Sequence, residues 1–149
     1  MGLDQNIYRK PNEPVVCDVC NSTGIDPQWG GMCDCLRGEE VAYFRKVNFL
    51  HKWVEDHLNE GRETNCEDIP FHLEAMAGLI KTCNEVLHHP ERGPELLPTM
   101  GRFFFGSEAY DEYYLKDVEA VRDALWNILN TELARHPATP HQYVYISSW

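Results

Sequence analysis

The stretch CDVCNSTGIDPQWGGMCDC, residues 17–35, holds four cysteines as a Cys17-x-x-Cys20 pair and a Cys33-x-Cys35 pair. Thiolates with these spacings can grip one ion, and two such pairs complete the tetrahedral four-thiolate shell typical of structural zinc. Glycine and proline residues between the pairs favour turns, as a loop tied to a metal requires. The pattern therefore predicts a zinc site that holds the N-terminal quarter of the chain together.

Two further features favour a metal over other states of these thiols. The opening segment MGLDQNIYRK lacks the apolar core of a secretory signal, so we expect a reducing, cytoplasmic location in which disulfides are rare. A shell of four thiolates also leaves no open position for a substrate, so the predicted zinc is structural rather than catalytic. An iron–sulfur cluster, two disulfides or free thiols are the alternatives.

Length and charge limit the classes of function. The 149 residues fit one domain, 1–149, in which residues 11–37 form a metal-stabilised insertion. With 13 basic and 24 acidic side chains the formal net charge is −11, which disfavours general binding to a nucleic-acid backbone. The sequence contains no apolar run long enough to span a membrane, so no membrane partner is expected.

Hydrophobic periodicity predicts two helices after the cysteine segment. Residues 3–9 favour a first strand, and a helix is expected to begin at residues 38–40 and to stop at Gly61. A second helix should begin with Asp68 as its cap, carry an apolar stripe as far as Leu87, and be followed by a loop over 88–98.

The last third of the chain predicts a long helix between two apolar segments. RFFF, residues 102–105, suits a buried strand or a tight aromatic loop. Ser107 can cap a helix whose apolar stripe runs to Glu132. QYVYISSW, residues 142–149, favours a strand. The predicted fold class is α+β. A small antiparallel sheet of the N-terminal strand, the FFF run and the C-terminal strand is packed by about three helices, with a four-cysteine zinc-knuckle insertion.

Two groups of polar and aromatic residues are candidates for binding a ligand. Cations, amides and aromatic rings suit an anionic or planar molecule, and glycines before a helix start allow close approach to an anion. The first group is Arg45, Asn48, Lys52 and Trp53 on the first predicted helix, with Arg9 nearby; the second is Arg102, Ser107, Tyr110 and Tyr114. The alternatives are a solvated helix face for the first group and an aromatic core with an ordinary serine cap for the second.

Four segments also resemble a group of small uncharacterised proteins of phages and prophages. They are MGLDQNIYRK at 1–10, EVAYFRKVNFLHKWV at 40–54, ELLPTMGRFFFGSEAYDEYYLKDVE at 95–119 and the aromatic-SSW ending at 143–149. The resemblance implies a role in the cytoplasm of a host bacterial cell and brings no catalytic residue with it. Residues 17–35 depart from the group, so the metal is expected to be a local structural replacement.

These observations predict a phage-encoded, non-catalytic binding protein with a possible role in counter-defence. It would sequester a small anionic, nucleotide-like ligand or block a host bacterial protein. One alternative is a small hydrolase of a phosphorylated or nucleotide substrate that uses Asp111, Glu112 or a histidine. Another is a zinc-stabilised protein-interaction module whose acidic surface contacts a basic partner. Assembly into a homo-oligomer stays open.

Overall fold

The first and last segments of the chain pair with each other at the centre of one sheet. The structure is a computed structural model that describes residues 2–11, 16–31, 33–36, 38–135 and 140–149. Its sheet has the order β2-β1-β4-β3 and every pairing is antiparallel. The strands are β1 (Asp4–Arg9), β2 (Glu39–Arg45), β3 (Ile69–Pro70) and β4 (Tyr143–Ser148). The α+β class and the small antiparallel sheet are therefore confirmed.

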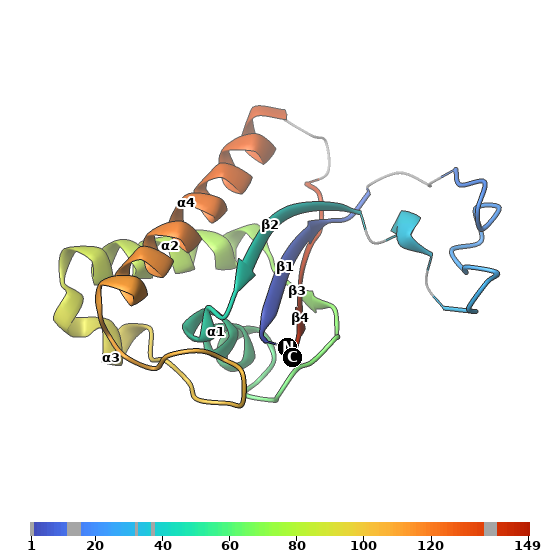
Figure 1. Cartoon of the computed structure of the whole chain (residues 1–149). Coiled ribbons are helices and arrows are strands. Elements are labelled where there is room, and N and C mark those ends of the chain that lie inside the picture. The colour runs from blue at the N-terminus through green and yellow to red at the C-terminus, as the bar shows by residue number, and fades with distance from the viewer. Residues whose placement is uncertain (1, 12–15, 32, 37, 136–139) are drawn as a thin grey trace.

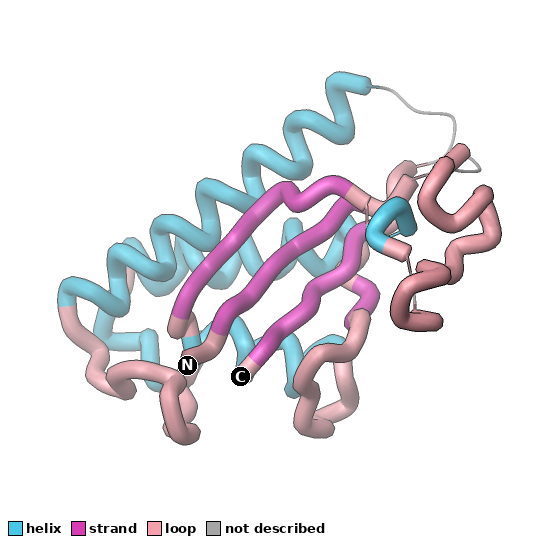
Figure 2. The backbone as a smooth tube through the Cα atoms, turned by 45° about the vertical axis from the view of Figure 1, so that its right-hand side comes forward, coloured by secondary structure: helices cyan, strands magenta, loops and turns pink. Residues whose placement is uncertain are grey.

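The helices gather on one side of this sheet (Figure 1, Figure 2). They are α1 (Asn48–Leu58), α2 (Leu73–His88), α3 (Gly93–Leu96) and α4 (Glu112–Arg135), with 3-10 turns at Asp34–Leu36 and Pro90–Arg92. Side chains alternate along strand β1, so that Gln5 and Ile7 are buried against the helices while Asn6 lies on the other face of the sheet. Within the described residues, no helix combines the length and hydrophobicity that a membrane crossing requires.

The prediction of a helix from residue 38 is wrong, because residues 39–45 form strand β2. Glu39 and Glu40 resemble acidic residues of a first helical turn, but they pair with Arg9 and Tyr8 of β1. At the base of this hairpin Gly38 has φ +91°, and a Cβ atom there would lie 2.1 Å from the Arg9 carbonyl oxygen. The cysteine segment thus connects two paired strands rather than a strand and a helix.

The FFF run is not a strand of the sheet, which corrects the second detail of the predicted fold. Residues 102–105 form a turn in which the Phe105 amide donates to the Arg102 carbonyl oxygen at 3.0 Å. Phe105 is buried, whereas Phe103 is 82% exposed and Phe104 has φ +70°. The turn bonds the Phe105 amide locally, while the carbonyl oxygens of Phe104 and Phe105 accept the Leu3 amide at 3.4 Å and the Asn48 side-chain amide at 3.2 Å, so these backbone groups are paired without a strand.

Helix α2 starts later than predicted, because Ile69 and Pro70 pair with β4 and His72 is still extended with ψ 152°. The loop expected over 88–98 contains the short helix α3.

The long third helix is confirmed as α4, although its cap differs. The Asp111 carboxylate accepts the Tyr114 amide at 3.0 Å, while the Ser107 hydroxyl accepts the Ala109 amide in the preceding turn. The buried residues of α4 follow the predicted stripe: Tyr114, Val118, Val121, Leu125, Ile128 and Glu132.

Candidate metal centre and ligand cavity

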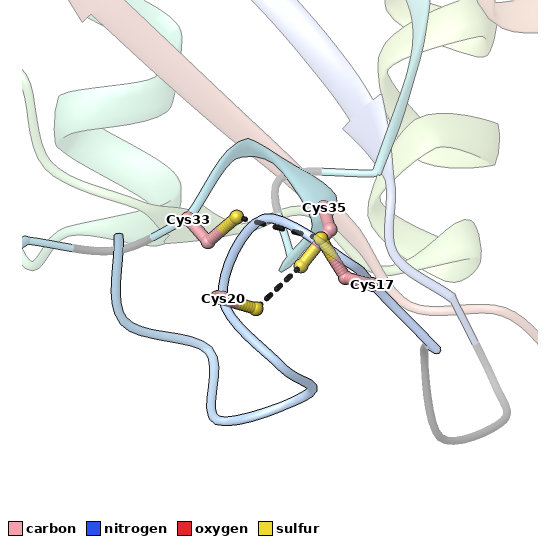
Figure 3. Close-up of side chains that lie close together, drawn as sticks. All are labelled: Cys17, Cys20, Cys33 and Cys35. Atoms are coloured by element: carbon pink, nitrogen blue, oxygen red, sulfur yellow. Dashed lines mark hydrogen bonds between the residues drawn. The ribbon is translucent and has the colours of Figure 1, made fainter. Parts of the chain in front are cut away.

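The four cysteine sulfurs gather around one point (Figure 3), with all of them within 4.8 Å of one another. Cys17 Sγ lies 3.9 Å from Cys33 Sγ, and Cys20 Sγ lies 3.7 Å from Cys35 Sγ. Four thiolates around zinc at about 2.3 Å would be spaced by about 3.8 Å along the edges of the tetrahedron. The sulfur atoms are too far apart for disulfide bonds, which need about 2.0 Å. The four cysteines can therefore hold a metal ion.

Tight turns place each cysteine pair. After the first pair, the Ser22 amide donates to the Cys17 carbonyl oxygen and the Thr23 amide to that of Cys20, both at 3.1 Å. Ser22 has φ 62°, a conformation that short polar residues tolerate better than bulky ones. The second pair is joined to the first through the Cys33 amide, which donates to the Gly24 carbonyl oxygen at 2.9 Å.

The pKa values of the cysteine thiols also suit binding of a cation. Burial raises the pKa of Cys20, but hydrogen bonds from the Gly24 backbone and the neighbouring thiols outweigh it and lower that pKa to about 7. Burial and hydrogen bonding with the other three cysteines raise the pKa of Cys35. One thiolate is thus stabilised at the expense of another, and a metal would replace the protons that the cluster shares.

The cysteine module, residues 16–31 and 33–36, projects beyond the end of the sheet opposite the two chain termini (Figure 1). Lys10 ties it to the body, since its ammonium group donates to the Leu36 carbonyl oxygen at 3.2 Å and lies 3.1 Å from Asp68. Several apolar side chains of the module are exposed: Val16, Val19, Ile25 and Trp29. Because the module buries so few of them, metal binding would supply the order that a hydrophobic core supplies elsewhere.

Four of the predicted ligand residues meet at one cavity, which we call the charged cavity. It has a volume of about 220 Å³ between the end of β2 and the start of α4, and its lining includes Arg45, Asn48, Ser107 and Tyr114. Arg45 is in strand β2, so the prediction that it shares a helix face with Asn48 and Lys52 is wrong. Both groups of candidates are nevertheless represented in this cavity.

Asn48 holds the wall of the charged cavity in place. It is 3% exposed and donates to the carbonyl oxygens of Phe105 at 3.2 Å and Ser107 at 2.8 Å. Its own side-chain oxygen accepts the Met100 amide at 3.3 Å. With these bonds made, Asn48 positions the loop over 100–107 rather than offering its amide to a ligand.

The other candidates lie elsewhere. Lys52 pairs with Asp56 at 2.9 Å and, with Trp53, borders a separate cavity of about 390 Å³. Arg9 pairs with Glu39 and borders a third cavity of about 230 Å³.

Neither Tyr110 nor Arg102 borders the charged cavity. The Tyr110 hydroxyl accepts the Thr99 amide at 2.9 Å. Arg102 donates to both Glu55 carboxylate oxygens at 2.9 and 3.0 Å, and its guanidinium lies 5.2 Å from the centre of the Trp149 ring.

A buried polar network around His51 was missed by sequence reasoning. The Gln5 amide donates to the Tyr145 hydroxyl at 3.0 Å, so the Tyr145 proton is directed to His51 Nδ1 at 2.9 Å. His51 Nε2 lies 2.8 Å from Glu55, in close contact but without the alignment of a hydrogen bond. Burial lowers the pKa of His51 despite the nearby Glu55 carboxylate. His51 and Glu55 are four residues apart on α1, so helical spacing alone places them side by side. Only the tertiary fold brings Gln5 and Tyr145 to them.

A second buried carboxylate, Glu132, lies at the end of the apolar stripe of α4, where the sequence pattern predicts no partner for it. It accepts the His141 backbone amide at 2.6 Å, the Tyr143 hydroxyl at 2.8 Å and the His141 ring at 2.9 Å. Burial raises the pKa of Glu132, but these hydrogen bonds outweigh it and leave that pKa lowered. Glu132 thereby clamps the start of β4 onto α4, beside a groove of about 680 Å³ that His141 and His72 border.

Comparisons with protein-family models, with curated proteins and with solved structures find no match to this chain.

Proposed function

We propose that this is a non-catalytic binding protein whose charged cavity receives a small ligand with an anionic group. The observation that carries the proposal is the convergence of Arg45, Ser107 and Tyr114 with a further cation, Lys46, around one cavity. Arg45 makes a loose ion pair with Asp4 at 3.6 Å, and Lys46 forms no ion pair with any residue that the structure describes. Cations with so few partners attract an anion at little cost in broken contacts.

A binding role fits these residues better than hydrolysis. Asp111 already accepts the Tyr114 amide as the cap of α4. Glu112 follows it directly on the helix surface, and neighbouring helical positions diverge, so the two carboxylates do not form an acid–base pair. The cysteine module then has a structural role with zinc as its metal, because a shell of four thiolates is closed.

Nucleotides and cyclic dinucleotides are the first ligands to test, since phosphate groups suit the two cations and the exposed ring of Tyr113, which also lines the cavity, suits a base. The resemblance to phage and prophage proteins supports a setting in an infected bacterium, where sequestering such a signal would counter host defence.

Isothermal titration calorimetry tests the proposal with nucleotides, cyclic dinucleotides and inorganic phosphate. We expect at least one phosphate-bearing molecule to bind, and Arg45→Gln to weaken that binding about tenfold, as loss of a charged hydrogen bond does. Arg62→Gln is the matched control, because the Arg62 side chain is 71% exposed in the loop after α1 and does not border the charged cavity. Equal loss in both variants, or no binding across the panel, would contradict the proposal.

The exposed apolar side chains of the cysteine module support a second candidate, a protein-interaction module. Trp29 is 66% exposed, and tryptophan is prominent among the residues that dominate protein interfaces. A basic host protein that binds this surface should no longer bind the Trp29→Ala variant. It should still bind Trp126→Ala, the control, because Trp126 is 57% exposed but lies on α4. Retention by both variants would argue against the module as the contact.

A further inference from the structure

The charged cavity has walls of opposite charge. Arg45 and Lys46 line it from the end of β2, whereas Asp111 lines it from just before α4 and Asp117 from the second turn of that helix. A site built for a simple anion would not need two carboxylates, because they repel the ligand that the two cations attract. The acidic wall therefore calls for a second chemical group on the ligand.

The two walls do not neutralise each other. In the part of the chain that the structure describes, neither aspartate forms an ion pair, and the ion pair that Arg45 makes is with Asp4 of β1. Ion pairs form readily between nearby side chains on a flexible surface, as they do for Lys52 with Asp56. The gap between the walls is thus held open by the fold.

Backbone constraints help to hold open the gap between the two walls of the charged cavity. Lys46 has φ 57°, and its amide donates to the Leu3 carbonyl oxygen at 2.7 Å, which anchors this residue to the start of the sheet. Gly106 lies so close that a Cβ atom there would be 3.2 Å from the Lys46 Cβ. On the facing wall, Asp111 is held by its bond to the Tyr114 amide.

The pKa of Asp117 is raised above its ordinary value. Burial raises the pKa of Asp117, and the charge of Asp111 raises it further. A protonated amine placed beside both carboxylates would relieve this repulsion and favour the ionised form of Asp117.

We infer that the ligand of the charged cavity is a small zwitterion, with its anionic group on Arg45 and Lys46 and its protonated amine on Asp111 and Asp117. The inference rests on the proposed function and narrows its ligand class. A cavity of about 220 Å³ is smaller than the roughly 300–1,000 Å³ of sites for drug-sized ligands. It suits a molecule of the size of an amino acid or an aminoalkyl phosphate, and a whole nucleotide would extend out of it.

Two pairs of probes that differ only in the amine test this by calorimetry: aminoethyl phosphate against ethyl phosphate, and alanine against propionate. We expect the amine to tighten binding about tenfold within at least one pair, the effect of one charged hydrogen bond. Asp117→Asn should remove that advantage, and it should not weaken binding of the amine-free probe, because one carboxylate that repels its anionic group is gone. Asp123→Asn, on the exposed side of the same helix, is the matched control and should change neither.

The outcomes separate the two proposals. If both members of each pair bind equally well, or if Asp117→Asn keeps the amine's advantage, the zwitterion is wrong while an anion-binding cavity stands. If none of the four probes and no nucleotide binds, both proposals fail. Circular dichroism and the thermal midpoint of each variant establish that the variant is folded.

Discussion

Arg102 donates two hydrogen bonds to Glu55 of α1, at 2.9 and 3.0 Å, from the turn that ends at the buried Phe105. Glu55 is nearly buried, with 5% of its side chain exposed, and it also accepts the Thr64 amide at 3.0 Å. The guanidinium lies over the ring of Trp149, so this one ion pair joins α1, the aromatic turn and the C-terminal strand.

Replacing Glu55 should therefore destabilise the whole fold. We expect Glu55→Gln to lower the free energy of unfolding by about 3 kcal/mol, because it leaves the partly buried Arg102 charge with only the more distant and more exposed Glu63, at 4.0 Å. Urea unfolding followed by circular dichroism measures this. Glu60→Gln is the control: its side chain is 85% exposed and its loose pair with Arg62 should contribute less than about 0.5 kcal/mol. Equal effects would show that the ion pair does not hold these elements together.

His51 should make the stability depend on pH. Its pKa is lowered from 6.5 by burial, so at mildly acidic pH the unfolded chain binds a proton that the folded chain does not. The free energy of unfolding should fall as pH falls below about 6.5, by up to about 1.4 kcal/mol per pH unit, until the folded-state pKa is reached. His51→Asn should flatten the slope between pH 7 and 5, whereas the exposed His88→Asn should leave it unchanged. An unaltered slope in His51→Asn would exclude His51 as its source.

Metal removal should loosen the cysteine module and spare the body. The purified protein is expected to hold one zinc per chain by elemental analysis, and a chelator or Cys20→Ser should release it. Amide exchange should then rise over residues 16–36 and stay slow in α2 and α4, because the module shares little core with them. Cys66→Ser, at an exposed cysteine outside the cluster, should keep the zinc. A chain without stoichiometric metal would refute the site.

Two glycines should respond to alanine in opposite directions. Gly38→Ala should destabilise the fold, since its φ is +91° and the added Cβ would collide with the Arg9 carbonyl oxygen. Gly78→Ala, in the middle of α2 with open space around it, should stabilise the fold by about 0.5–1 kcal/mol. Thermal or urea unfolding of both variants checks the signs. A neutral Gly38→Ala would mean that the β1–β2 hairpin can close in another way.

Sequence reasoning succeeded where the signal is local. The spacing of Cys17, Cys20, Cys33 and Cys35 predicts a cluster because ligands a few residues apart need little help from the rest of the chain. The strand at residues 142–149 and the apolar stripe of α4 were predictable for a similar reason, since periodicity reports which face of an element is buried.

The failures lie where a distant partner decides the outcome. By its sequence pattern, EEVAYFR at 39–45 could extend helix α1 toward the N-terminus. It forms a strand instead because its backbone groups hydrogen-bond to β1. The FFF run is apolar enough for a strand, but among the described residues no strand pairs with it, and residues 102–105 turn instead. The positions of His51 and Glu132 looked ordinary in sequence, since burial of a polar side chain is visible only with its partners.

Spacing and periodicity act within one segment, and they are enough to predict the cysteine cluster, the terminal strands and the long amphipathic helix. Tertiary structure decided that the cluster connects two paired strands and that Arg45 and Lys46 face Asp111 and Asp117 across one cavity. It did so because strand pairing and side-chain burial join residues far apart in the chain, and no local pattern encodes such contacts.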